Sequence, residues 1–246
     1  MNRFQAASAI VFVFSTLTLA AQCGSVDGGT AGKPFRAEFH CRDTQTLANG
    51  AQVVRENSGV VARDGEGRTY VKTSPHGPNM PVSVYVHDWA KGTTTAWQEP
   101  KEGDGGKQDS VRMTATLWRG VPVVARPQTA AEEKALLEST MCPKQPQENL
   151  TCEDLGTRTI AGVVAHGTMQ QRTVPVGESG NNAPFVVTYE RWYSPELRVM
   201  LEGTTNDPRD GEHTMVVESI NQSEPPASLF EVPQGYTVQE QPKQSQ

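Results

Sequence analysis

The stretch from Phe185 to Ile220 constrains the fold more than any other part of this chain. It holds three runs of strand-type residues, separated by a Ser-Pro break and by a turn rich in Pro, Gly and Asp. Apolar and polar residues alternate within the runs, which is the period-2 pattern of a half-buried strand. The stretch therefore predicts an antiparallel meander of three strands.

Similar patterns occur earlier in the chain. Phe35–Cys41 alternates in the same way, and Asn49-Gly50 is a strong hairpin signal after it. Val82–His87 and Thr93–Gln98 are separated by the turn residues Lys91-Gly92, and Ser110–Leu117 has one apolar face. These segments predict a β-meander that continues through the first half of the chain.

A more apolar segment, Arg158–Ala165, lacks this alternation. Because both of its faces are apolar, we expect a central strand that is covered on both sides. Gly167–Pro175 is expected to be its antiparallel return, and Gly177–Pro184 a loop.

Helical signals are few. Thr129–Ser139 is the clearest, because Thr129 is a suitable N-cap, Glu132 has capping-box spacing and the interior residues are good helix formers. Pro225–Phe230 is expected to form a short turn of helix before the last extended segment.

These elements predict a mainly β (α+β) fold. We expect one large, curved antiparallel sheet in the shape of a half-barrel, with one or two helices on a face; a β-sandwich is the alternative. Without repeats or a long biased linker, residues 34–238 are expected to form a single domain. A flexible Gly-rich lead-in at 22–33 precedes it, and a disordered polar tail at 239–246 follows.

Residues 1–21 have the pattern of a signal peptide. Arg3 supplies the positive start, Ala9–Phe14 the apolar core, and Ala20-Ala21 a small-residue cleavage region. Gln22 stands where a lipoprotein signal has a small residue, which argues against lipid attachment at Cys23. The sequence thus predicts a periplasmic or secreted protein with no transmembrane segment in the mature chain.

The charge balance narrows the partners. Loss of Arg3 with the signal leaves 21 basic against 28 acidic residues, a formal charge of −7. A surface of mixed, net negative charge without a Lys/Arg cluster argues against nucleic acid as a partner.

Four cysteines lie after the predicted cleavage region, and an oxidising compartment favours disulfides. The short polar loop between Cys142 and Cys152 makes that pair the first candidate, with Cys23 and Cys41 as the second, although four thiols allow three pairings. No C-x-x-C spacing and no pair of histidines at ligand spacing occurs, so no metal site is predicted.

Two sequence patterns resemble catalytic motifs. His166 followed by Gly177-Glu-Ser179-Gly echoes serine-protease motifs, but the two lie too close in sequence, and Asn181 breaks the nucleophile elbow. We therefore interpret His166 as a strand residue and Ser179 as a loop residue.

A charged group in the meander is the second pattern. Paired carboxylates do acid/base chemistry if a cleft separates their pKa values, whereas on an open sheet face they form cross-strand ion pairs. The ion-pair interpretation is favoured, and no catalytic residue is assigned. The group comprises Glu190, Arg191, Trp192, Tyr193, Asp207, Arg209, Asp210 and Glu212.

Six aromatic residues form a third set with two interpretations. In one interpretation these residues line an apolar ligand cavity inside the curved sheet. In the other they form the core beneath the sheet. The set comprises Tyr85, Trp89, Trp97, Trp118, Tyr189 and Trp192. Phosphate loops and dinucleotide fingerprints are absent, so no cofactor is predicted.

Several motifs together carry a family resemblance, among them Leu155–Val163, Glu190–Leu197, Asp207–Glu212 and Glu224–Tyr236. They resemble those of a family of uncharacterised secreted bacterial proteins. The ending Leu229-Phe-Glu-Val-Pro-Gln-Gly-Tyr236 is also similar to the end of LolA/RseB-like lipoprotein-carrier domains. That similarity implies a curved sheet wrapped around helices, with an apolar concavity for acyl chains; no functional residue is carried over from it.

The functional expectation is an exported, non-enzymatic envelope protein that binds an apolar ligand or another envelope component, such as a lipid or a lipoprotein, on its curved sheet. One alternative is a hydrolase that acts on envelope material through the acidic group. A structural or interaction module is the other.

Overall fold

The computed structural model describes residues 32–74, 81–99, 113–119, 142 and 147–241. These residues form one twelve-stranded sheet and a single turn of 3-10 helix, η2 (Ala227–Phe230). The strands are β1 (Phe35–Thr46), β2 (Gln52–Arg63), β3 (Thr69–Ser74), β4 (Val82–Asp88), β5 (Thr93–Glu99), β6 (Thr114–Arg119), β7 (Leu150–Ile160), β8 (Val163–Val174), β9 (Phe185–Ser194), β10 (Val199–Asp207), β11 (Gly211–Asn221) and β12 (Thr237–Glu240).

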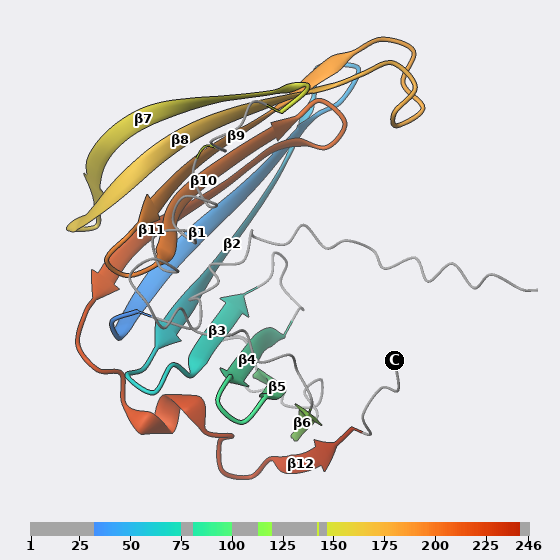
Figure 1. The fold of residues 1–246 in the computed structure, drawn as a ribbon. Helices are drawn as coiled ribbons and strands as arrows, with labels where there is room; N and C mark the ends of the chain where they lie inside the picture. The colour runs from blue at the N-terminus through green and yellow to red at the C-terminus, as the bar shows by residue number, and fades with distance from the viewer. Residues whose placement is uncertain (1–31, 75–80, 100–112, 120–141, 143–146, 242–246) are drawn as a thin grey trace, which may run out of the picture.

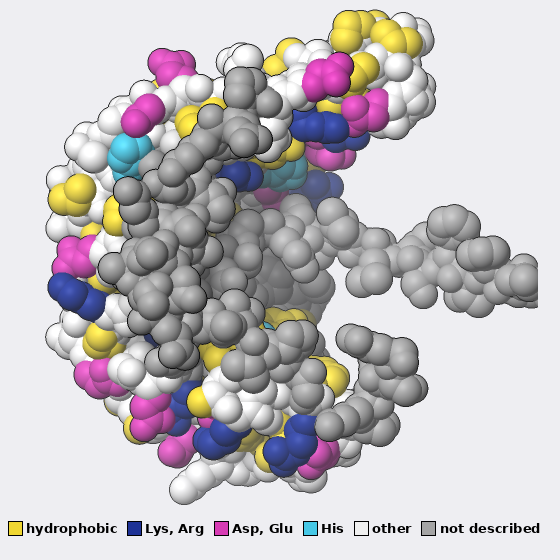
Figure 2. All heavy atoms as spheres, in the orientation of Figure 1, with side chains coloured by type: hydrophobic (Ala, Val, Ile, Leu, Met, Phe, Trp, Pro, Cys, Tyr) yellow, Lys and Arg dark blue, Asp and Glu magenta, His cyan; other side chains and the backbone are white. Residues whose placement is uncertain are grey.

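The sheet is strongly curved (Figure 1). Its strand order is β12-β6-β5-β4-β3-β2-β1-β11-β10-β9-β8-β7, and every pair is antiparallel except β12 with β6. The pairing of β1 with β11 joins the two meanders into one surface. In the space-filling view the molecule is an arc that opens to one side (Figure 2).

The predicted curved sheet is confirmed, whereas the alternative of two packed sheets is wrong, because all twelve strands belong to one sheet. The expectation of one or two helices on a face is not met in the described part of the chain, where η2 at Ala227–Phe230 is the one helical element. That turn falls within the predicted Pro225–Phe230. The helix expected at Thr129–Ser139 lies outside the described residues. No helix in the described ranges has the length and hydropathy of a membrane span.

The three-strand meander over Phe185–Ile220 is confirmed as β9, β10 and β11. The interpretation of Arg158–Ala165 as one central strand is wrong. The chain turns at Ala161 and Gly162, whose φ angles are +47° and +82°, so this segment is a hairpin between β7 and β8. Its apolar residues come from two strands that meet at the turn, and β7 is an edge strand of the sheet.

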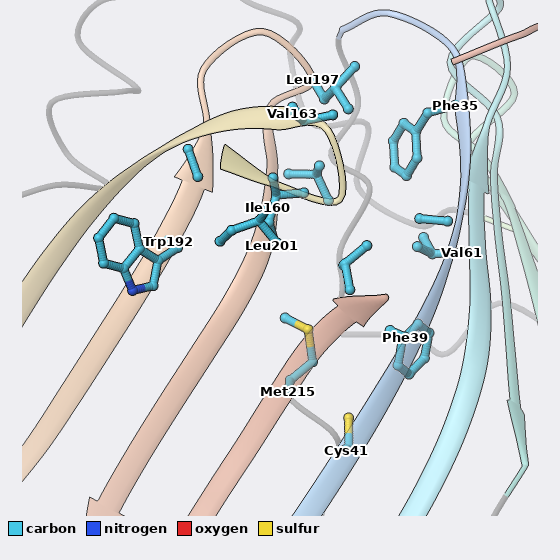
Figure 3. Packing of buried hydrophobic residues seen from close by; sticks show 14 residues of the cluster. Phe35, Phe39, Cys41, Val61, Ile160, Val163, Trp192, Leu197, Leu201 and Met215 are labelled. Atoms are coloured by element: carbon cyan, nitrogen blue, oxygen red, sulfur yellow. The ribbon is translucent and has the colours of Figure 1, made fainter. Parts of the chain in front are cut away.

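The first buried cluster lies on the face of β1 that carries Phe35, Ala37, Phe39 and Cys41, here called the inner face. Strand register places Val61 of β2 and Met215 and Val217 of β11 on that same face. Figure 3 shows these side chains together with Leu201 of β10 and with Ile160 and Val163 from the β7–β8 hairpin. Phe35, Val61 and Leu201 are fully buried and Met215 and Val217 at most 4% exposed, so the centre of this apolar surface is filled rather than open.

The second buried cluster lies on the opposite, outer face of β3 to β6. It contains Tyr70, Val84, Val86, Trp97 and Ala115, which strand register places on one side of the sheet. The C-terminal segment covers it: Leu229, Phe230, Val232 and Tyr236 pack here, and η2 lies outside the curve (Figure 1). The Leu229–Tyr236 motif thus has a packing role in this chain.

The buried face of the sheet changes from the inner to the outer side at β2. Val61 faces the inner cluster and Ala62 the outer one, and both are fully buried. One half of the sheet therefore buries its inner face and the other half its outer face. Among the described residues, the inner face of β4 to β6 contributes to neither buried cluster.

The predicted Cys142–Cys152 disulfide is present, with 5.5 Å between the two Cα atoms. Cys41 is also disulfide-bonded, and its predicted partner Cys23 lies outside the described residues. The bond at Cys152 ties the edge strand β7 to the segment before it.

Candidate functional site

The six aromatic residues singled out in the sequence do not line one cavity. Trp97 belongs to the outer buried cluster and Trp192 to the inner one, so for these two the core interpretation is correct. Tyr189 lies beneath the Arg191 guanidinium, 5.2 Å from it, and the Trp89 indole donates to the Thr69 hydroxyl at 3.3 Å. Of the six, Tyr85 and Trp118 remain exposed, at 41% and 37%.

Tyr85 and Trp118 belong to a groove of about 370 Å³ on the inner face of β4, β5, β6 and β12. Its volume falls in the usual range of ligand sites, roughly 300–1,000 Å³. None of the described residues that line it is charged. They are Ser83, Tyr85, Ala96, Trp97, Gln98, Thr114, Thr116, Trp118 and Gln239.

Strand register explains how these side chains meet. Tyr85 of β4 pairs with Ala96 of β5, and Ala96 pairs with Thr116 of β6, so the three form one row across the sheet. Trp118 is two residues beyond Thr116 and points to the same side. The small Ala96 side chain lies between the larger Tyr85 and Thr116, and this difference in size makes room for the groove. Trp97 points to the opposite face, where it is buried.

The charged side chains of these strands all lie on one face of the sheet. The charged residues of β3, β4, β5, β6 and β12 are Lys72, Asp88, Glu99, Arg119 and Glu240. The register places all of them on the outer face, where Lys72 pairs with Glu99 at 2.8 Å and Arg119 with Glu240 at 2.5 Å. The inner face of the same strands is formally neutral and rich in hydroxyl groups.

The next row of the inner face carries a histidine. His87 Nδ1 lies 2.8 Å from the Thr94 hydroxyl, and its ring stacks on Trp89 with 5.2 Å between ring centroids. Thr94 pairs in turn with Trp118. These contacts hold the imidazole beside the groove.

The acidic group in the meander consists mainly of ion pairs and hydrogen bonds. The Trp192 indole donates to Glu190 at 2.6 Å. Arg158 lies 3.8 Å above the Trp192 ring and pairs with Glu202 at 2.6 Å. Glu212 is exposed. Within the group itself, the ion pair between Asp207 and Arg209 lies in one turn, and the cross-strand pair of Arg158 with Glu202 is formed by residues outside the group.

Asp207 and Arg209 form a closed unit in the β10–β11 turn. The Arg209 guanidinium donates to both carboxylate oxygens, at 2.9 and 2.5 Å, and its backbone N–H donates as well. The hydrogen bond from the Arg209 side chain lowers the pKa of Asp207 below its usual value, although burial opposes the shift. A carboxylate held ionised in this way fixes the turn and is a poor proton donor.

The protease-like pattern has no catalytic geometry. His166 is a residue of β8 and its Nε2 lies 2.9 Å from Asp154, whereas Ser179 lies in the following loop, with its Oγ 3.3 Å from Asn181. Both residues occupy the kinds of element that the sequence predicted. In the described ranges, no group of three His, Cys, Asp or Glu residues is placed to hold a metal ion.

No family model and no curated protein matches the chain. Solved structures do match. The complex of Pseudomonas aeruginosa MucA and MucB matches with a TM-score of 0.41 and 10% identity, over 85% of this chain and 58% of that one. An uncharacterized conserved protein from Thermus thermophilus has a TM-score of 0.43 and 10% identity, over 86% and 93% of the two chains.

A LolA superfamily protein from Nitrosomonas europaea matches as well, with a TM-score of 0.28 and 10% identity, over 86% of this chain and 97% of that one. The chain spans less than two thirds of the MucA/MucB match. At such identities and TM-scores these matches carry no argument about this chain, so the function rests on its own residues.

The groove is not evident from the sequence, where Tyr85 and Trp118 are two of six candidate aromatic residues. The signal that separates them is their alternation with the charged and core residues of the same strands: Ser83, Tyr85 and His87 share one side of β4, whereas Val82, Val84 and Val86 share the other. Which of the two sides would be covered depended on the path of the C-terminal segment.

Proposed function

We propose that this chain is an exported, non-enzymatic envelope protein that binds a ligand or another envelope component in the groove on the inner face of its curved sheet. The observation that carries the proposal is the pair of exposed aromatic rings, Tyr85 and Trp118, above an uncharged lining. Aromatic side chains that remain partly exposed in a concave site are typical anchors for a ligand.

The filled inner cluster argues for this location. An apolar ligand was expected on the curved sheet, but the apolar residues around Phe35 and Leu201 are fully buried. A ligand there would have to displace packed side chains. The groove offers accessible surface on the same side of the sheet without such a cost.

The hydrolase alternative finds less support in the geometry. Glu190 accepts a hydrogen bond from Trp192, Glu202 pairs with Arg158 and Asp207 with Arg209. Carboxylates engaged in this way stabilise the sheet. Acid/base chemistry would need two carboxyl groups whose environments separate their pKa values.

Export is part of the proposal and rests on the sequence of residues 1–21. The disulfide between Cys142 and Cys152 supports it, because such bonds persist in oxidising compartments. Cell fractionation followed by N-terminal sequencing of the mature protein tests this part: a chain that starts at Met1 in the cytoplasm would refute it.

The binding part is tested by native mass spectrometry of the protein purified from its own cell envelope. We expect an adduct on the wild-type protein and on Arg119→Ala, whose side chain lies on the outer face of β6. The Tyr85→Ala/Trp118→Ala double variant should lose the adduct. Repeated absence of any adduct, or an adduct that the double variant retains, would refute the proposed groove function.

A further inference from the structure

The chemistry of the groove indicates the class of its ligand, an inference that rests on the proposed function and makes it more specific. We infer that the groove takes a neutral, linear glycan, with one sugar ring against Tyr85 and another against Trp118. Three features of the described residues lead to this class: uncharged polar groups, two separated aromatic rings and a lining without charge.

The first feature is the polar lining. Ser83, Thr114 and Thr116 contribute hydroxyl groups, and Gln98 and Gln239 contribute amides. Hydroxyl and amide groups can each donate and accept hydrogen bonds. A sugar hydroxyl also does both, so a dense array of such groups matches a polyhydroxyl ligand without leaving a buried group unsatisfied.

The second feature is the separation of the two rings. Tyr85 and Trp118 lie two strands apart and two residues apart along the strands, as the pairing of Tyr85 with Ala96 and of Ala96 with Thr116 defines. Strand spacing and rise place their Cα atoms about 12 Å apart. A linear chain of a few sugar units spans such a distance, and the small Ala96 lies beneath its path.

The aromatic rings provide the apolar part of the recognition. One face of a pyranose ring presents C–H groups, which are weakly positive, and the face of an aromatic ring is negative. Tyr85 and Trp118 are held by the sheet yet keep 41% and 37% of their surface exposed. The pairing of β4, β5 and β6 fixes the backbone positions from which both rings project, and their exposed faces are available to a sugar ring.

The third feature is the lack of charge among the described lining residues, which argues against other ligand classes. An anionic headgroup, a phosphate or an acidic glycan is normally held by Arg or Lys. Here the charges of these strands, such as Lys72 and Arg119, lie on the outer face in ion pairs with Glu99 and Glu240. A long acyl chain would require a continuous apolar lining, whereas in this lining hydroxyl and amide groups are interspersed among the apolar side chains.

The inference is tested by isothermal titration calorimetry on the full mature chain. The neutral probes are linear oligosaccharides of N-acetylglucosamine and of β-linked glucose. The matched probes are a linear oligogalacturonate, which adds charge, and decanoate, which is apolar. We expect saturable binding of at least one neutral oligosaccharide, and binding at least tenfold weaker for both matched probes.

Variants locate the binding. Trp118→Ala should weaken it at least tenfold, and Trp118→Phe by less, because a ring is retained. Arg119→Ala, the neighbouring residue on the opposite face, should bind like the wild type. Circular dichroism and unfolding midpoints establish that each variant is folded.

Several outcomes would overturn the inference. These are the absence of saturable binding to both neutral oligosaccharides, equal binding of the oligogalacturonate, or unchanged binding in the Tyr85→Ala/Trp118→Ala double variant. If decanoate or a lipid adduct occupies the groove and depends on Trp118, the glycan inference fails while the proposed binding function stands.

Discussion

The guanidinium of Arg63, at the end of β2, donates a hydrogen bond to the carbonyl oxygen of Leu197, in the turn between β9 and β10. The same nitrogen donates to the carbonyl of Lys33 at 2.8 Å, and the guanidinium carbon lies 5.0 Å from the centroid of the Phe35 ring. Arg63 is fully buried. A charged side chain thus connects two segments 134 residues apart and closes the end of the inner cluster.

Replacement of Arg63 should be severely destabilising. Arg63→Ala leaves two backbone carbonyls without their donor and opens a cavity beside Phe35, so we expect a loss of about 3–5 kcal/mol in the free energy of unfolding. Arg63→Lys should recover little, because a compact, strongly hydrated ammonium group is costlier to bury and does not replace the guanidinium beside the Phe35 ring. Urea denaturation measures the effect. Arg55→Ala, an exposed position on the same strand, should stay within about 0.5 kcal/mol. Similar stability of Arg63→Ala and Arg55→Ala would contradict this role.

Gly59 should not tolerate a side chain. A Cβ atom built on Gly59 would lie less than 3.0 Å from the backbone oxygen of Lys72 and from the Phe39 ring. Because the strand backbone cannot yield easily, Gly59→Ala should lower the free energy of unfolding by about 1–3 kcal/mol. Thermal unfolding provides the measurement. Ser58→Ala, the adjacent exposed position, serves as the control and should change stability little. A wild-type unfolding midpoint for Gly59→Ala would show that β1 and β3, which carry Phe39 and Lys72, can move away from β2 at little cost.

Tyr70 should make the fold sensitive to alkali. Burial, followed by the negative charge of Glu99, raises the pKa of Tyr70 to about 12. In the unfolded chain a tyrosine ionises near pH ~10. The stabilising contribution is therefore complete below about pH 10 and is lost as the pH rises through about 12.

Absorbance at ultraviolet wavelengths where tyrosinate absorbs tests this expectation, since it counts ionised tyrosines among the five in the chain. The wild-type protein should show a late titration step that Tyr70→Phe lacks. The stability of Tyr70→Phe should also fall less steeply between the unfolded-state pKa and the folded-state value of about 12. Tyr85→Phe, at an exposed position, should leave the late step in place. A late step that persists in Tyr70→Phe would assign it to another tyrosine.

Removal of the Cys142–Cys152 disulfide should destabilise the protein moderately. The two residues are 10 positions apart, and closure of a loop of this size is worth about 2–4 kcal/mol. The double variant Cys142→Ser/Cys152→Ser should show this loss in urea denaturation. Thiol titration of the unfolded, non-reduced double variant should find no free thiol, because Cys41 is bonded elsewhere. A free thiol in that variant would show that Cys41 does not pair with Cys23, the other cysteine that the variant retains.

Much of the fold was predictable, because strand signals are local. The alternation in Phe35–Cys41 and Val82–His87 and the Asn49-Gly50 turn predicted β1, β4 and the first hairpin. The hairpin within Arg158–Ala165 escapes local signals, because Ala161 is not a typical turn residue and yet adopts a positive φ beside Gly162. Gln239 and Glu240, expected in the disordered tail, belong to β12, whose parallel pairing with β6 no local pattern reveals.

The candidate site was much less predictable. A period-2 pattern divides β4 into the face of Tyr85 and the face of Val84, but it does not say which of the two is covered. The sequence by itself determined the positions of most strands and of the meander over Phe185–Ile220, because alternation and turn residues are local signals. Only the tertiary structure decided that Phe230 and Tyr236 cover the outer face of β3 to β6. Burial depends on which distant segment packs against a strand, and that contact leaves Tyr85 and Trp118 exposed on the inner face.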